Sequence, residues 1–202
     1  MTKLNDFIND FPQIEKYPYP KYTFSSKKIS KENLIQEFTQ NWELAGGKSL
    51  KISEKKRLFQ EILKFGFLTQ NASIYSTFSL EIDSSIKGEF SFLKEKEIQK
   101  PQDFDNLDVL FVEAKLGVAN QGALWIPKNT LPYDAGLFLC KHQVILINKK
   151  SLYYNMEEAI TKHTKLFKHG GFWIAGPSKT ADIEQSLVIG AHGPLTSIAV
   201  LY

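Results

Sequence analysis

Apolar residues follow a helical period in the first third of the chain. Over residues 30–45 they recur at every fourth position, which places one continuous apolar stripe on a helix. Ser30 is a suitable N-cap for this helix, and the pair Gly46-Gly47 is a suitable end. The pattern therefore predicts an amphipathic helix whose buried face consists of Leu34, Phe38 and Trp42.

Unbroken apolar runs bounded by polar residues predict strands that are covered on both faces. Such runs occur at residues 143–148, 172–175 and 196–201. A helical pattern over 156–168 connects the first two runs, so we expect these three segments to form a βαβ unit. Nearer the start, a short strand at 48–52 precedes a second predicted helix at 53–64.

The middle of the chain predicts one further strand and a hairpin. Residues 74–82 alternate between apolar and polar side chains, as a half-buried strand does. Residues 115–119 and 123–126 flank Asn120-Gln121-Gly122, where Gly122 can adopt the positive φ that a tight turn requires. We therefore expect these two segments to pair as a β-hairpin.

Strands that alternate with helices predict an α/β fold with three α/β/α layers around a mixed, largely parallel sheet. The length of 202 residues fits one domain. Residues 1–29 differ from the rest of the chain in composition, with three prolines among aromatic residues. Proline restricts the backbone to extended conformations. We expect an extended N-terminal arm over 1–29 and a single domain over 30–202.

Composition and charge exclude several classes of protein. The hydrophobic fraction of 43% and the charged fraction of 23% are those of a globular protein. A net charge of +3 without a basic stripe does not favour a nucleic-acid partner. The single Cys140 cannot form a disulfide within the chain or supply the ligand set of an iron-sulfur cluster. No signal-peptide pattern and no apolar run near ~20 residues is present, so we expect a cytoplasmic protein without a membrane span.

Polar side chains concentrate directly after the apolar run at 172–175. Ligands bind α/β sheets at the carboxyl ends of strands, which makes the loop with Ser178, Thr180, Asp182 and Glu184 a candidate site. A purely structural explanation also exists. Ser178 or Thr180 could cap a short helix, and the two carboxylates could then stabilise its first turn. The residues alone leave both interpretations open.

His192 lies in the turn at 190–194 and could act as an acid, a base or a metal ligand, or simply bond a backbone carbonyl. We expect no metal site, because the spacing of Asp182, Glu184 and His192 matches no standard metal motif. Ser178 lacks the Gly-x-Ser-x-Gly elbow of hydrolases. The two carboxylates would also repel phosphate unless Lys179 or a metal offset their charge, which leaves hydroxylated small molecules, cations or a partner protein as ligands.

The string Gly176-Pro-Ser-Lys-Thr-Ala-Asp-Ile-Glu184, followed by Gly190-Ala-His-Gly-Pro194, resembles the signature of the LUD domain, the family of bacterial lactate-utilisation proteins of the LutC/YkgG type. His142 also matches a position that is often histidine in similar domains. The resemblance implies the fold of the ribose-phosphate isomerase, glucosamine-phosphate deaminase and CoA-transferase group (NagB/RpiA/CoA transferase-like). It further implies a role in the oxidation of L-lactate to pyruvate, with partner subunits that carry iron-sulfur clusters.

The predicted hairpin departs from this resemblance at one point. Members of the family often read Ala-Glu-Thr-Gly or Ala-Asp-Ser-Gly, whereas this chain has Ala119-Asn-Gln-Gly122. An acidic residue there is similar to the catalytic glutamate of CoA transferases, and an amide cannot act as nucleophile or general base. We therefore do not expect CoA transfer. Amides still donate and accept hydrogen bonds, so Asn120 and Gln121 could bind a carboxylate or hydroxyl ligand.

Three functions remain. The first is a subunit or accessory protein of lactate oxidation that has no identifiable cofactor of its own and binds its ligand or partners through Asn120, Gln121, Gly122, Ser178 and Thr180. The second is a stand-alone enzyme for a small hydroxy-acid or sugar-like substrate, with Asp182 or Glu184 as base and His192 as acid. The third is a structural module in which these residues serve only caps and turns. Both functional alternatives require the hairpin tip and the carboxyl-terminal loop to meet at one rim of the sheet.

Overall fold

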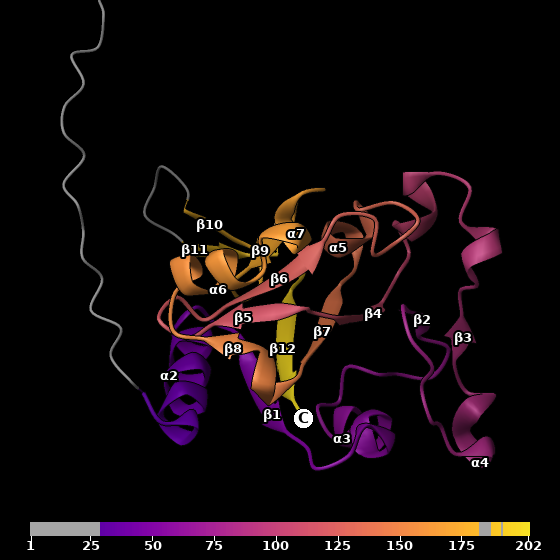
Figure 1. The fold of residues 1–202 in the computed structure, drawn as a ribbon. Coiled ribbons are helices and arrows are strands. Elements are labelled where there is room, and N and C mark those ends of the chain that lie inside the picture. The colour runs from indigo at the N-terminus through magenta and orange to yellow at the C-terminus, as the bar shows by residue number, and fades with distance from the viewer. Residues whose placement is uncertain (1–28, 182–186, 191) are drawn as a thin grey trace, which may run out of the picture.

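The computed structural model describes residues 29–181, 187–190 and 192–202 (Figure 1). Its α-helices are α2 (Lys31–Leu44), α3 (Leu58–Leu63), α4 (Ser84–Lys87), α5 (Gly136–Leu139), α6 (Met156–Lys162) and α7 (Thr164–Phe167). Short 3-10 helices are η1 (Lys55–Arg57), η2 (Glu95–Glu97), η3 (Pro101–Phe104) and η4 (Lys149–Ser151). The strands are β1 (Lys48–Lys51), β2 (Ser73–Ser76), β3 (Ser91–Phe92), β4 (Val109–Glu113), β5 (Leu116–Val118), β6 (Ala123–Pro127), β7 (His142–Ile147), β8 (Leu152–Tyr153), β9 (Gly171–Ile174), β10 (Lys179–Ala181), β11 (Leu187–Ile189) and β12 (Thr196–Leu201).

Six strands form a parallel sheet in the order β1-β12-β7-β4-β2-β3. In its centre, β12 lies in register with β7 from the pair Thr196 and His142 to the pair Leu201 and Ile147. These two strands consist almost entirely of apolar residues, as expected for strands buried on both faces. The predicted α/β fold with a largely parallel sheet is thereby confirmed.

A second, four-stranded sheet with the order β8-β5-β6-β9 lies across the parallel strands (Figure 1). The hairpin of β5 and β6 is its centre, and β9 pairs with β6 antiparallel. A separate antiparallel pair is formed by β10 and β11. The predicted hairpin is confirmed, and Gly122 at its tip has a φ of 55°.

Side chains on the two faces of the parallel sheet belong to separate hydrophobic clusters. One face packs against α2 and the second sheet, through residues such as Leu110, Ile145 and Leu124. The opposite face packs against α3, through residues such as Phe111, Val144 and Ile62. Neighbouring strand residues alternate between the two clusters because successive side chains point to opposite faces.

The outer face of the second sheet has its own cluster, which packs against α6 and α7 and is formed by Leu116, Val118, Ala123, Trp125 and Ala159. Among the described residues, no helix is long and apolar enough to cross a membrane.

Four local predictions are wrong. The helix expected over 156–168 is divided into α6 and α7 at His163, whose φ of −131° and ψ of 37° are not helical. The run at 172–175 forms β9 of the second sheet, so it completes no βαβ unit with β7. The short helix expected after Ser178 begins instead as strand β10. The strand expected over 74–82 ends at Ser76. The arm at 1–28 lies outside the described residues.

Candidate functional site

The carboxyl-terminal end of α2 is fixed by its own backbone and by one tryptophan. Gly46, with a φ of 87°, takes the left-handed conformation that ends many helices, and its amide donates to the carbonyl of Glu43 (2.8 Å). The buried Trp42 indole nitrogen donates to the carbonyl of Lys48 (3.0 Å) at the start of β1. The helix end is therefore held rigidly against the parallel sheet.

The tip of the β5–β6 hairpin packs directly on this helix end. The side-chain amide of Asn41 donates to the carbonyl of Ala119 (2.8 Å). A Cβ atom on Gly122 would collide with the backbone nitrogen of Trp42, so only glycine allows this approach. The backbone nitrogen of Asn120 donates to the carbonyl of Tyr154 (3.0 Å). The side chains of Asn120 and Gln121 are exposed, which leaves both amides accessible to a ligand.

The loop that follows β9 reaches the same helix end one turn further along. Gly176 has a φ of 81°, and a Cβ atom there would lie 2.8 Å from the carbonyl oxygen of Ala45. A Cβ atom on Gly46 would likewise lie 2.8 Å from Cε of Lys179. Since Trp42 and Ala45 are three residues apart on one helix, they lie on adjacent turns of one surface. The hairpin tip and the Gly176 loop therefore lie next to each other on one surface at the end of α2.

The turn before β12 joins this group through Ser178. The amide of Ser178 donates to the carbonyl of Pro194, and its carbonyl accepts from the amide of Gly190 (both 3.0 Å). A Cβ atom on Gly193 would lie 2.9 Å from Cβ of Ser178. His192 precedes this glycine and is exposed. We call residues 120–122, 176–179 and 192–194, gathered around 41–47, the motif cluster.

The structure thus places Asn120, Gln121, Gly122, Ser178 and His192 in one region. Thr180 belongs to β10, but its side chain, like all of Asp182 and Glu184, lies outside the described residues. The location differs from the prediction in one respect. The Gly176 loop leaves a strand of the second sheet and bonds to Pro194, ahead of β12, so the cluster lies near the amino end of that parallel strand.

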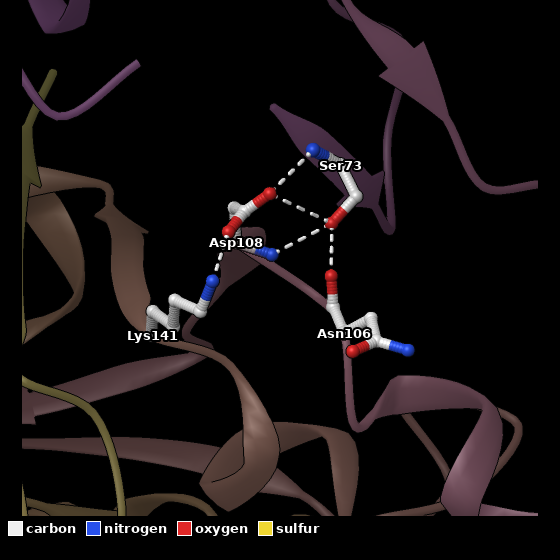
Figure 2. Close-up of polar contacts among 4 residues, drawn as sticks. All are labelled: Ser73, Asn106, Asp108 and Lys141. Atoms are coloured by element: carbon white, nitrogen blue, oxygen red, sulfur yellow. Dashed lines mark hydrogen bonds and ion pairs between the residues drawn. The ribbon is translucent and has the colours of Figure 1, made fainter. Parts of the chain in front are cut away.

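A second polar group ties the amino ends of three parallel strands together (Figure 2). Asp108 accepts from the amide of Ser73 (2.8 Å) and from the ammonium of Lys141 (2.7 Å). The Ser73 hydroxyl accepts from the amide of Asp108 (2.8 Å) and donates to the carbonyl of Asn106. Burial by itself would raise the pKa of Asp108, but the bonds from Lys141 and Ser73 outweigh it and lower that pKa. Asp108 is therefore held as a structural anion.

His142 begins the central strand β7 beside this group. Its Nδ1 lies 2.9 Å from the hydroxyl of Thr196, and its ring stacks on Phe67 with centroids 4.6 Å apart. Burial lowers the pKa of His142, although the charge of Asp108 partly opposes this. A neutral, stacked and hydrogen-bonded imidazole suits a structural role.

Comparison with known proteins identifies the family. Residues 32–202 match the LUD domain. The chain belongs to the LUD-domain family. This LUD domain is 33% identical over 130 residues to an uncharacterized protein of Neisseria meningitidis serogroup B, over 59% of this chain and 53% of that protein.

Two relatives carry a functional name. The LUD domain is 33% identical over 70 residues to lactate utilization protein C of Bacillus pumilus, which covers 32% of this chain and 29% of that protein. It is 35% identical over 68 residues to lactate utilization protein C of Shouchella clausii, which covers 31% of this chain and 30% of that protein. The matches therefore span about half of the meningococcal relative and less than a third of the other two.

A solved structure shows the same fold. The crystal structure of a DUF162 family protein from Deinococcus radiodurans matches this LUD domain with a TM-score of 0.62, over 86% of this chain and 98% of that chain. The two sequences are 12% identical, so this similarity shows a shared fold and leaves function to the site itself.

The motif cluster of this LUD domain can bind polar groups. The exposed amides of Asn120 and Gln121 offer both donors and acceptors, and the ammonium of Lys179 adds a positive charge. Neither amide can take up a proton as a general base at neutral pH. Within the described part of the cluster, the exposed imidazole of His192 adds a further hydrogen-bonding group.

Sequence reasoning missed Asn41 as a member of the cluster, and missed the group around Asp108. The Gly46-Gly47 pair was a signal for the helix end, but which loops rest on it depends on contacts between residues far apart in sequence. Ser73, Asp108 and Lys141 each stand at the start of, or directly before, a parallel strand, and the strand order alone brings them together.

Proposed function

We propose that this LUD domain serves in L-lactate utilisation as a subunit or accessory protein that binds a small ligand or partner subunits at the motif cluster. One observation supports this location above all others: Gly122 and Gly176, from loops far apart in sequence, contact adjacent turns of the α2 end. The named relatives, lactate utilization proteins C, support the lactate context.

Electron transfer in this proposal belongs to partner subunits with iron-sulfur clusters. The chain has a single cysteine, Cys140, which is buried, and burial raises its pKa to about 12. A thiol must lose its proton to ligate iron, so this residue is unsuited to that role. We place the assembly in the cytoplasm, where these thiolate clusters would be protected from oxidation.

Complementation tests the proposal. In a host that grows on L-lactate and lacks its own copy of this gene, the Asn120→Ala/Gln121→Ala double variant should fail to restore growth. Both side chains are exposed and the backbone bond of Asn120 remains, so folding should be retained. Gln70→Ala, an exposed amide outside the cluster, is the control. Normal growth of the double variant, with co-purified partners unchanged, would exclude the cluster as the functional surface.

A stand-alone enzyme for a small hydroxy acid or sugar-like substrate is the second candidate. The exposed His192 beside the Ser178 turn favours it, since an imidazole there could act as general acid, with Asp182 or Glu184 as base. The purified chain would then turn over its substrate unaided, and His192→Ala would abolish turnover. L-lactate oxidation only in the presence of partner subunits would favour the accessory role.

A further inference from the structure

A polar cavity of about 370 Å³ opens at the end of β2, and none of its lining residues belongs to the motif cluster. Its walls come from the carboxyl end of β2, from η2 and from the loop between β6 and α5. The lining residues are Tyr75, Ser76, Thr77, Glu95, Asn129, Thr130, Leu131 and Pro132. A volume of this size is typical of small-molecule sites.

Tyr75 presents an unpaired hydroxyl to this cavity. The residue is only 6% exposed, and its ring packs edge-on against Phe104 with centroids 5.5 Å apart. Among the described residues its hydroxyl has no hydrogen-bond partner, and it is not sealed off from solvent, so it is available to a ligand. Burial, together with the negative charge of Glu95, raises the pKa of Tyr75, so the group stays protonated and can donate.

Further hydrogen-bonding groups surround the same space. Asn129 has a φ of 62°, and its backbone amide donates to Asp134 (3.0 Å), which fixes the loop that carries its side chain. The Thr130 hydroxyl donates to the carbonyl of Pro127 (2.6 Å), which leaves its oxygen free to accept from a ligand. Thr77 adds a second hydroxyl, where β2 leaves the sheet.

The charge of the lining restricts the ligand. Glu95 is the one ionisable residue besides Tyr75 in the described lining, and no lysine, arginine or histidine stands there. An anion would be repelled and would find no cation to bind. A carboxylate accepts hydrogen bonds only, so the group that meets Glu95 must donate, and a charged donor gives the stronger bond.

We propose that this cavity binds a small polyhydroxylated amine, of the size and chemistry of an amino sugar. Its ammonium group would meet Glu95, its hydroxyls would bond Tyr75, Thr77 and Asn129, and its apolar ring face would rest on Leu131. The proposal is independent of the motif cluster, and L-lactate, which is an anion, is not a ligand for this cavity.

Three sugars of similar shape and different charge test the proposal on the full chain. D-glucosamine, D-glucose and D-glucuronate are titrated by calorimetry at a pH where the amino sugar is cationic. Affinity should fall in that order, and glucuronate should not bind. Equal or tighter binding of glucuronate, or no binding of glucosamine up to high millimolar concentration, would overturn the proposal.

Two variants connect binding to named groups. Tyr75→Phe removes one hydroxyl and keeps the packed ring, and should weaken glucosamine binding about fivefold. Glu95→Gln should weaken it at least about tenfold and abolish the preference over glucose. Glu89→Gln, an exposed carboxylate outside the cavity, is the control.

A third variant has a matched control in the same chain. Asn129→Gly removes the amide side chain and keeps a residue that tolerates positive φ. It should weaken binding, whereas Asn71→Gly, at the other described non-glycine residue with positive φ (65°), should not. If all three cavity variants bind glucosamine as the natural protein does, the cavity is not the site.

Discussion

At the scale of single residues, three glycines of the motif cluster stand where no side chain fits. Gly122 contacts the backbone of Trp42, Gly176 contacts that of Ala45, and Gly193 contacts Ser178. The first two also have a positive φ, so a substitution there meets both a steric clash and backbone strain. The identity of Gly122 and Gly176 is therefore set by close approach of backbone to backbone.

Gly122→Ala should lower the free energy of unfolding by about 2–4 kcal/mol, from the collision with α2 and the strain of positive φ together. Urea denaturation followed by circular dichroism measures this loss. Gly66→Ala separates the two causes, because Gly66 has a φ of 77° and open space around it. Gly66→Ala should lower the free energy of unfolding by only about 1 kcal/mol. An equal loss in both variants would show that the packing on α2 contributes nothing.

Asp108 should make stability depend on pH in the acidic range. Its pKa is lowered in the folded protein, so its contribution is fully present above the ordinary value of 3.8 and is lost as the pH falls through the folded value. Asp108→Asn should therefore lower the free energy of unfolding by about 1 kcal/mol near pH 6, and by progressively less below pH 4. Asp105→Asn, at an exposed carboxylate outside this group, is the control. A penalty for Asp108→Asn that is constant with pH would exclude the charge as its source.

At the scale of elements, the sequence correctly predicted the helices and strands that the local pattern of apolar and polar residues determines. The helix that begins after Ser30, the strands around Val144 and Ile198, and the hairpin at Gly122 all formed as expected. The predictions were wrong where the neighbouring strand in space determines the structure of a segment. The run at 172–175 is as apolar as a strand of the parallel sheet, but its partner is β6 of the second sheet. Nothing local distinguishes these two outcomes.

The break between α6 and α7 has a similar origin. His163 leaves the helical conformation, and its Nε2 lies 2.6 Å from the hydroxyl of Tyr153 in β8. The apolar period over 156–168 continues through this position, so periodicity alone cannot reveal the break. The tertiary contact accompanies a kink that local propensity does not predict.

The start of α6 depends on one capping side chain. Asn155 accepts from the amide of Glu158 (2.8 Å), so Asn155→Ala should lower the free energy of unfolding by about 1 kcal/mol. Asn155→Gly should cost only a few tenths of a kcal/mol, because glycine is itself a tolerated N-cap. Thermal unfolding of the two variants side by side checks this order. The reverse order would contradict the capping role.

At the scale of the whole molecule, the candidate site depends on contacts between segments that are far apart in the sequence. Sequence identified the hairpin tip and the carboxyl-terminal loop separately. Residues 120–122 and 176–178 lie at adjacent turns of the α2 end, whereas Asp182 and Glu184 lie outside the described residues. The sequence could not show that α2 joins the hairpin tip and the loop, or that they lie near the amino end of β12, because both follow from long-range packing. The cavity at Tyr75 escaped notice for the same reason, since its walls come from three distant segments.

The central position of β12 makes its side chains critical for global stability. Ile198 is fully buried in the cluster that packs against α3, so Ile198→Ala should lower the free energy of unfolding by about 2–5 kcal/mol. Ile160→Ala makes the same chemical change at a side chain that is 40% exposed, in α6, and should cost less than about 1 kcal/mol. Chemical denaturation compares the pair. Similar losses would argue against a core that is centred on β12.

Strand β12 lies between β1 and β7, so the first and the last strands of the described residues are neighbours in the sheet. During synthesis on the ribosome, β1 and β7 emerge long before residues 196–201, and until then both have an open hydrogen-bonding edge. Exposed edges of this kind promote association with other chains. Between the synthesis of β7 and that of β12, the growing polypeptide is therefore open to association with other chains at both of these edges.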